Sequence, residues 1–236
     1  MPGELRAGSG RTLPAPQAHH VARVLRLAEG DALTLFNGDG SEYDAVVARM
    51  ARDAVTVKIS GARSAAREPA LEIVLGQALS SGERMDYTVQ KAVELGVAAI
   101  HPLAASRSVV RLDAARAEKR VAHWQSVAIA ACEQSGRNRI PPVAPVMPLE
   151  SWLGQGAATA LRLLLSPHGE TRMRDLARPD GAIVLLAGPE GGFTQEEEAL
   201  ARRSGCTPVR LGPRVLRTET AAVAALAAMQ ALWGDF

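Results

Sequence analysis

The chain has 236 residues and a formal net charge of +2, and 47% of its residues are hydrophobic, which is enough for a packed core in one large domain or two smaller ones. No uncharged apolar run reaches the roughly 18 residues of a membrane-spanning helix, and the N-terminus lacks the apolar segment of a signal peptide. The two cysteines are far apart and match no metal or redox spacing. We therefore expect a cytoplasmic protein with reduced thiols, no membrane partner and no metal site.

The first part of the chain is predicted to form a small β-barrel-like domain. A short helix over residues 19–26 comes first, and Asn-Gly-Asp-Gly at 37–40 is a strong hairpin turn. Expected strands cover residues 32–36, 43–48 and 54–59. The stretch 61–69 is rich in small and polar residues and ends in proline, so we place a boundary there. The predicted domains are residues 1–68 and 69–236.

The second part of the chain has a different pattern, in which apolar strands alternate with helices. Expected strands cover residues 71–78, 98–102, 161–165 and 182–187, and expected helices cover residues 84–95, 114–134, 194–204 and 218–233. Such alternation is typical of an α/β domain with a mostly parallel, buried sheet. The predicted fold class is therefore α/β.

The segment 185–193 (LLAGPEGGF) is the first candidate site. An apolar strand runs into a glycine-rich turn, which lets the backbone approach a ligand closely, although a tight connection without a ligand explains the turn about equally well. Thr194 is expected to cap the next helix in a capping box with Glu197. Glutamates in that first turn suit the helix dipole but would repel a phosphate. A ligand without phosphate and with a positive centre, such as S-adenosylmethionine, fits better.

A second turn follows a short strand, in the segment 209–220 (VRLGPRVLRTET). The helix after it is apolar on nearly every side and must be largely buried, with Thr218 or Thr220 as the expected cap. The two turns could form the two lips of one adenosine pocket. Arg214 and Arg217 lie in the second turn, and a solvated loop is the alternative interpretation for both.

Basic residues concentrate in the segment 102–140, which carries seven basic and three acidic residues. The helix expected to end at Gly136 is followed by Arg137, Asn138 and Arg139. Arginine makes bidentate contacts with phosphates, although basic residues also favour a solvated helix end.

The predicted N-terminal helix offers another basic face, because Arg23 and Arg26 lie three residues apart. This face, with Asn37 near it, could bind an RNA backbone. Aromatic residues make up only 3% of the chain, so stacking of bases on several rings is not expected. Recognition by shape and phosphate contacts, with one extruded base, fits this composition better.

Taken together, these residues resemble the RsmE-type methyltransferases of the SPOUT class, which form N3-methyluridine in small-subunit ribosomal RNA. The resemblance covers nearly the whole chain. It is carried by residues 23–26 (RVLR), 85–96 (MDYTVQKAVELG), 129–139 (IAACEQSGRNR), 188–192 (GPEGG) and 211–220 (LGPRVLRTET). The last two motifs in this order are a specific pair. One departure lies before Ala7, where the family usually has an arginine near a short first strand; Arg6 and Arg11 are the candidates here.

The resemblance implies a PUA-like RNA-binding barrel for residues 1–68 and a trefoil-knot SPOUT methyltransferase domain for residues 69–236, active as a homodimer. It implies S-adenosyl-L-methionine as the cofactor. The implied substrate is 16S rRNA of the small ribosomal subunit, at the uridine numbered 1498 in the family's scheme. The alternatives are a SPOUT enzyme acting on tRNA, a non-catalytic RNA-binding assembly factor and a nicotinamide-dependent oxidoreductase. The glutamates after GPEGG and the lack of a GxGxxG element disfavour the last of these.

Individual residues are assigned expected roles on this basis. Arg214 and Arg217 are the catalytic candidates that would stabilise negative charge on the uracil, and Glu219 or a water is the candidate proton acceptor. The expected cofactor-binding residues are Leu165, Ala187, Gly188, Pro189, Glu190, Gly191, Gly192, Leu211, Gly212, Leu216, Arg217, Thr218 and Glu219. The expected RNA-binding residues are Arg23, Arg26, Asn37, Lys91, Arg107, Arg137, Asn138 and Arg139.

Overall fold

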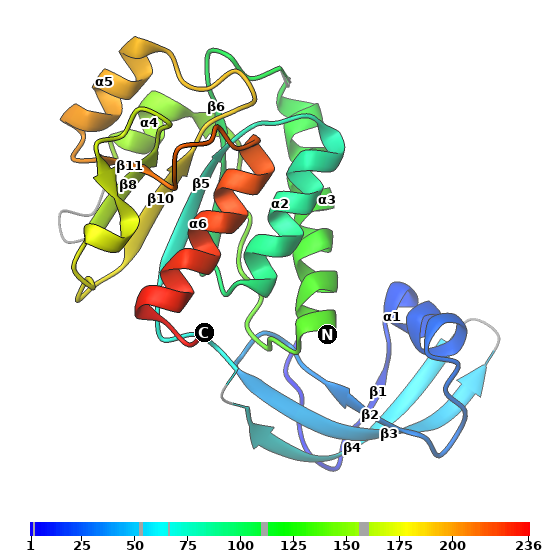
Figure 1. Ribbon diagram of the computed structural model, residues 1–236. Coiled ribbons are helices and arrows are strands. Elements are labelled where there is room, and N and C mark those ends of the chain that lie inside the picture. Colours follow the sequence, from blue (N-terminus) through cyan, green and yellow to red (C-terminus); the bar gives the residue numbers. More distant parts are fainter. Residues whose placement is uncertain (2, 52–53, 66, 110–112, 156–160) are drawn as a thin grey trace. The chain divides into compact units, whose positions relative to one another are not determined.

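The computed structural model describes residues 1, 3–51, 54–65, 67–109, 113–155 and 161–236. The chain separates into two compact units (Figure 1). The first unit consists of Met1–Glu68 and Gly136–Ile140, and the second of Pro69–Ser135 and Pro141–Phe236. The segment Gly136–Ile140 therefore packs with the N-terminal residues, whereas its position in the sequence had placed it in the second domain.

The first unit is built on an antiparallel sheet with the strand order β1-β4-β3-β2. The strands are β1 (Gly10–Thr12), β2 (Ala32–Leu35), β3 (Ser41–Ala51) and β4 (Ala54–Ser64). β3 and β4 extend beyond the predicted strands because their ladder continues past the apolar residues, with register shifts at Asp44/Ala45 and Val47/Arg49. β1 was not predicted, since its three exposed residues have no apolar pattern. The small β-domain is thus confirmed as a four-stranded sheet.

The helix predicted over residues 19–26 begins and ends earlier in the structure. α1 (Ala15–His19) continues directly into a π-helical turn, η1 (His20–Val24). Proline in the first turn of α1 is favourable because its missing N–H has no helical partner there. The apolar side of the two turns completes the core of the unit, which includes Ala18, Val21, Leu35, Val47, Val57 and Ile59.

The second unit contains a seven-stranded sheet with the order β7-β6-β5-β10-β8-β11-β9. The strands are β5 (Ile73–Ala78), β6 (Ala99–Ala104), β7 (Met147–Pro148), β8 (Leu161–Leu165), β9 (Thr171–Arg172), β10 (Ile183–Ala187) and β11 (Thr207–Arg210). Every pairing between them is parallel, which confirms the predicted α/β fold class. β7 and β9 were not predicted, since two residues are too few to show a periodic pattern.

Helices cover both faces of this sheet (Figure 1). α2 (Gly82–Glu94), α3 (Ala114–Ser135) and α6 (Thr218–Trp233) lie together on one face, and the 3-10 turn η2 (Met173–Asp175) packs beside α6. α4 (Leu149–Leu153) and α5 (Gln195–Arg203) pack together on the other face. The strands between them are buried, as expected for a parallel sheet covered on both sides. Within the described part of the chain, no helix has the length and apolarity needed to cross a membrane.

The strand order determines where loops of the second unit meet. β10 is inserted between β5 and β8, and β11 is inserted between β8 and β9. Because these strands are parallel neighbours, their carboxyl ends lie at one edge of the sheet, and the loops that follow them come together there. The trefoil knot that the resemblance implies stays a prediction.

Candidate functional site

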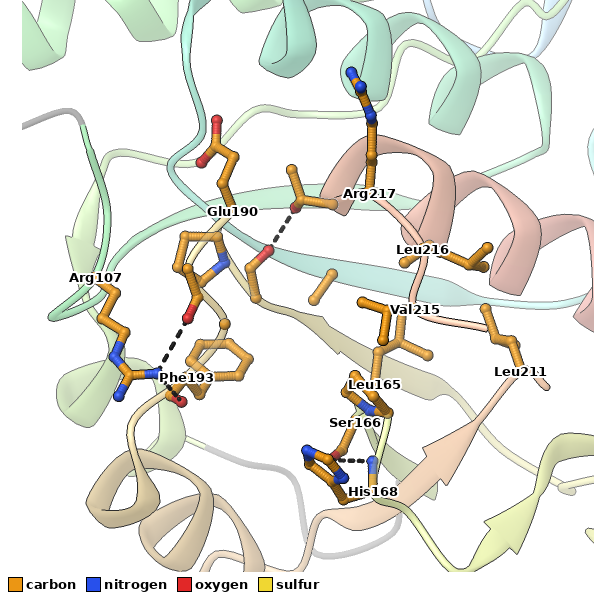
Figure 2. A pocket seen from close by; sticks show the side chains of 18 of the residues that line it. Arg107, Leu165, Ser166, His168, Glu190, Phe193, Leu211, Val215, Leu216 and Arg217 are labelled. Atoms are coloured by element: carbon orange, nitrogen blue, oxygen red, sulfur yellow. Dashed lines mark hydrogen bonds between the residues drawn. The ribbon is translucent and has the colours of Figure 1, made fainter. Parts of the chain in front are cut away.

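A pocket of about 460 Å³ lies at the carboxyl ends of β8, β10 and β11 (Figure 2). Most of its lining comes from the loops that follow these three strands. The predicted cofactor-binding residues that line it are Leu165, Ala187, Gly188, Pro189, Glu190, Gly191, Gly192, Leu211, Gly212, Leu216, Arg217 and Thr218. Glu219 is the one member of the predicted set that is not part of the lining. The two glycine-containing turns are therefore brought together around one cavity.

The first wall is the glycine-rich loop 188–192. Gly192 has a φ of 66°, in the left-handed region that favours glycine. Arg107 holds this loop from outside, since its Nη1 donates hydrogen bonds to the carbonyl oxygens of Gly191 at 3.1 Å and Phe193 at 3.4 Å (Figure 2). Arg107 was assigned to RNA contacts from the sequence. In the structure its guanidinium supports the loop and lines the pocket.

The predicted capping box at the start of α5 is confirmed. The Thr194 hydroxyl accepts a hydrogen bond from the Glu197 N–H at 3.2 Å, and the Glu197 carboxylate accepts one from the Thr194 N–H at 2.8 Å. The other oxygen of Glu197 accepts from the Ser106 N–H at 2.7 Å. Glu197 therefore stabilises the start of α5 and the loop at Ser106, while the Glu198 carboxylate lines the pocket.

The second wall is the loop between β11 and α6. The prediction that Thr218 or Thr220 caps α6 is wrong, because the N-cap residue is Arg217 and no side chain caps the helix. The Thr218 hydroxyl instead donates a hydrogen bond to the Gly188 carbonyl, on the opposite wall. The same hydroxyl accepts a hydrogen bond from Nε2 of Gln77 at 3.1 Å.

Gln77 is a component of the site that the sequence analysis missed. It is fully buried near the end of β5, and its Nε2 also lies 3.0 Å from the carbonyl oxygen of Ala78 and 3.4 Å from that of Gly188. One amide therefore connects β5 with both walls. The sequence signal that could have identified Gln77 is its polar side chain inside the apolar strand β5, because most buried amides have hydrogen-bond partners.

Arg84 forms a small charged cluster with two glutamates at one side of the pocket. Its Nη1 lies 3.1 Å from Oε1 of Glu190, and its Nε lies 3.9 Å from Oε1 of Glu219. Burial raises the pKa of Glu190, but hydrogen bonds, chiefly from Ser81 and also from Arg84, outweigh it and hold the pKa below its usual value. Glu190 therefore stays ionised. The Oε2 atoms of both glutamates are buried and accept no hydrogen bond from the described residues.

The two arginines predicted to be catalytic, Arg214 and Arg217, both line the pocket and are exposed. Figure 2 shows the side chain of Arg217 extending away from the apolar part of the pocket around Leu165 and Leu216. Neither guanidinium forms a hydrogen bond or ion pair with the residues that the structure describes. Both positive charges thus remain available to a ligand at the pocket mouth.

The predicted presentation of Arg137 and Asn138 to RNA does not match the structure. Both residues are buried in the first unit, with exposures of 6% and 1%. Glu68 explains this burial, since its Oε2 lies 2.6 Å from Nη2 of Arg137 and its Oε1 accepts from the Asn138 N–H at 3.2 Å. Arg139 is exposed, although its backbone N–H also donates to Glu68 at 3.0 Å. Arg137 and Asn138 therefore anchor their segment to the first unit.

The remaining RNA-binding candidates differ in their exposure and in the contacts that they already make. Arg23 and Arg26 are exposed on the first unit. The Asn37 side chain belongs to the hairpin turn, where it donates to the Gly3 carbonyl and accepts from the Asp39 N–H, both at 3.2 Å. In the second unit, Lys91 forms an ion pair with Glu94 at 2.7 Å.

The pocket lining also includes residues outside the two turns that the sequence indicated: Arg84, Arg107, Ser166, Pro167, His168, Glu198 and Ala221. Three of them lie in the loop after β8, where a Ser-Pro pair directly after an apolar strand was a usable signal. The others become neighbours only through the order of the strands. In the described part of the chain, no group of three or more histidine, cysteine, aspartate or glutamate residues is arranged to hold a metal ion.

Comparison with known proteins identifies the family. Residues 67–230 match the model of an RNA methyltransferase domain, and residues 13–60 match that of an RNA methyltransferase PUA domain. The chain is 33% identical to ribosomal RNA small subunit methyltransferase E of Buchnera aphidicola (from Acyrthosiphon pisum), over 92% of this chain and 86% of that protein. It is 32% identical to the Bacillus subtilis protein of the same name, over 92% of this chain and 88% of that one. The chain belongs to the ribosomal RNA small subunit methyltransferase E family.

Two solved structures with bound S-adenosyl methionine agree with the fold of the chain. A ribosomal RNA small subunit methyltransferase E from Neisseria gonorrhoeae, bound to S-adenosyl methionine, has a TM-score of 0.94 and 42% identity, covering 100% of this chain and 97% of that one. A putative methyltransferase from Legionella pneumophila, in complex with the same cofactor, has a TM-score of 0.95 and 42% identity with the same coverage.

Proposed function

We propose that this protein transfers the methyl group of S-adenosylmethionine to N3 of a uridine in 16S ribosomal RNA, the uridine numbered 1498 in the family's scheme. The observation that carries the proposal is the pocket between the loops after β8, β10 and β11. Two relatives of this fold at 42% identity contain the cofactor. The volume of about 460 Å³ is in the range of sites for small molecules and cofactors.

The charged and apolar residues that line the pocket suit a cationic cofactor without phosphate groups. Glu190 is held ionised, its Oε2 has no partner among the described residues, and Glu198 adds a second carboxylate. Leu165 and Leu216 supply apolar surface for an adenine ring, and the backbone of residues 188–192 supplies close polar contacts. When bound, the cofactor supplies a methyl group activated by its sulfonium.

The chain's own contribution to the reaction is positioning and charge. N3 of uracil carries a proton, so negative charge develops on the base when that proton leaves. Arg214 and Arg217 line the pocket, are exposed and are unpaired within the described residues, so they are placed to stabilise this charge. Glu219 lies outside the lining and beside Arg84, and its Oε2 retains accepting capacity. We assign it, or a water that it orients, as the proton acceptor.

The two units have separate roles in this proposal. Residues 1–68 are the PUA-like RNA-binding domain, with Arg23 and Arg26 as exposed cations, and the segment Gly136–Ile140 of the same unit adds the exposed Arg139. Residues 69–236 are the methyltransferase domain. The protein works in the cytoplasm on the small ribosomal subunit as a homodimer that needs no metal.

A methyl-transfer assay tests this function. Labelled S-adenosylmethionine is supplied with unmethylated small ribosomal subunits, naked rRNA or bulk tRNA, and the product nucleosides are identified by mass spectrometry. N3-methyluridine in 16S rRNA is the expected product. Label in tRNA alone would show that the substrate is tRNA rather than 16S rRNA. If no RNA is labelled and calorimetry detects no cofactor binding, the protein is a non-catalytic RNA-binding factor.

A further inference from the structure

A second hollow lies beside the cofactor pocket in the same unit. It has a volume of about 560 Å³ and is enclosed by residues of β9, η2, the end of β11 and the C-terminal half of α6. Three arginines line it: Arg172, Arg174 and Arg210. Leu211 and Gly212 line both this hollow and the cofactor pocket, so one short loop forms a wall of each.

The fold concentrates positive charge in this hollow. Arg172 and Arg210 are register partners in the parallel pair β9–β11, and like charges opposite each other destabilise a sheet. The structure gives neither guanidinium a hydrogen bond or an ion pair within the described ranges. Arg174 reaches Asp175 at 3.8 Å, but both side chains are exposed, so this contact is weak. Among the described residues, Arg172 and Arg210 therefore lack an anion that would offset their repulsion.

The hollow adjoins the side of the cofactor pocket that carries Arg214 and Arg217. On one side of the Leu211–Gly212 wall are the three arginines of the hollow, and on the other are Arg214 and Arg217. Guanidinium groups bind phosphates in bidentate geometry, and a row of them follows a polyanion. The apolar side of the hollow, which includes Met173, Ala228 and Leu232, offers a surface for a ribose or a base.

We propose that the hollow binds backbone phosphates of the RNA strand that flanks the nucleotide entering the cofactor pocket. This inference rests on the proposed function and adds a phosphate site on the methyltransferase unit itself. Charge complementarity favours RNA over a protein surface as the occupant, because three clustered cations need a dense anion. The target base and its flanking phosphates would thus be held on the two sides of one loop.

The test replaces two arginines and compares the result with a matched control. Arg172→Gln combined with Arg210→Gln removes both register partners. The control combines Arg202→Gln with Arg203→Gln, two exposed residues of α5 that line neither cavity and give the same change in net charge. Binding of unmethylated small subunits and of a 16S rRNA transcript is measured from 50 to about 300 mM salt.

We expect the hollow variant to bind RNA about tenfold more weakly at 100 mM salt, and the slope of log K against log salt to fall by about 2, one for each lost phosphate contact. Cofactor affinity should stay unchanged. The melting temperature should not fall, because removing a like-charge pair relieves repulsion, whereas a structural role of the two arginines would lower it. The α5 control should keep the wild-type slope.

Three outcomes would overturn the phosphate site. An equal loss in both variants would show a general charge effect. An unchanged slope, with a changed sedimentation coefficient, would show that the hollow contacts a second copy of the chain. An unchanged slope and coefficient would leave the hollow without a role in RNA binding. Methylation of RNA by the wild-type protein would leave the proposed function standing after any of these three outcomes. Failure of the wild-type protein to methylate any RNA would overturn both the proposed function and the phosphate site.

Discussion

The side-chain amide of Gln77 donates a hydrogen bond to the hydroxyl of Thr218 at 3.1 Å, although 141 residues separate them in the chain. Thr218 in turn donates to the carbonyl oxygen of Gly188. A residue of the central sheet thereby sets the spacing between the two loops that enclose the cofactor pocket. Preorganised walls lower the cost of ordering a site when its ligand binds.

Replacing Gln77 by leucine should therefore weaken cofactor binding. Leucine has a similar size but leaves Thr218 and Gly188 without the amide donor, so we expect about a tenfold increase in the dissociation constant of S-adenosylmethionine and a loss of about 1–3 kcal/mol in the free energy of unfolding. Calorimetry and denaturant titration measure the two effects. The control is Gln90→Leu on α2, where the side chain is exposed. Unchanged affinity in Gln77→Leu would show that the loops hold their spacing without it.

Replacing Arg214 by alanine should lower turnover more than cofactor binding. Arg214 is exposed at the pocket mouth, so its charge is available to the reacting base rather than to the fold. Loss of one charge-stabilising donor costs on the order of 100-fold in kcat. Single-turnover kinetics and calorimetric titration of S-adenosylmethionine separate the two quantities, with Arg203→Ala as the control. Equal losses in turnover and in cofactor affinity would remove the catalytic assignment.

Replacing Glu68 by glutamine should destabilise the first unit. The Arg137 side chain is 7% exposed and would lose the carboxylate that forms an ion pair with it at 2.6 Å, which costs about 3 kcal/mol for a buried pair. Denaturant unfolding measures this loss. The double variant Glu68→Met with Arg137→Met should lose less than Glu68→Gln, because no buried charge remains. Glu4→Gln, at an exposed ion pair, should leave unfolding unchanged. If the double variant is the least stable, packing rather than charge governs this contact.

Replacing Gly76 by alanine should destabilise the second unit. A Cβ atom at this position in β5 would overlap the ring of Trp152, which is itself buried. Overpacking of this kind costs about 1–3 kcal/mol. Gly82→Ala is the matched control, because nothing lies within 4 Å of the added methyl group there. Similar melting temperatures for the two variants would mean that Trp152 moves aside without cost.

The pH dependence of unfolding should reveal the ionised state of Glu190. Its pKa in the folded protein lies below the ordinary value of 4.5, because hydrogen bonds from Ser81 and Arg84 outweigh the effect of burial. The resulting stabilisation is complete above pH 4.5 and is lost as the pH falls through the folded pKa. The difference in unfolding free energy between the wild-type protein and Glu190→Gln should shrink below pH 4.5. A difference that stays constant into this acid range would contradict the depressed pKa.

Local interactions explain what was predictable about the fold. The end of β8 at Leu165 and the bounds of α6 match the predictions, because apolar runs and periodicity are properties of neighbouring residues. The capping box of Thr194 and Glu197 is confirmed for the same reason, since its partners lie three residues apart. The short strands β1, β7 and β9 were missed because pairing with distant strands, rather than their own pattern, defines them.

The sequence by itself determined the α/β class, the main helices and strands of the second unit and the two turns that line the pocket, since each depends on residues close together in the chain. Only the tertiary structure decided how their polar groups are used. Thr218 bonds Gly188 and Gln77 instead of capping α6. Arg137 is buried against Glu68 instead of facing solvent. The physical reason is that a buried polar group without a partner is unfavourable, and the partner is most often supplied by whichever distant segment the order of strands and the packing bring beside it.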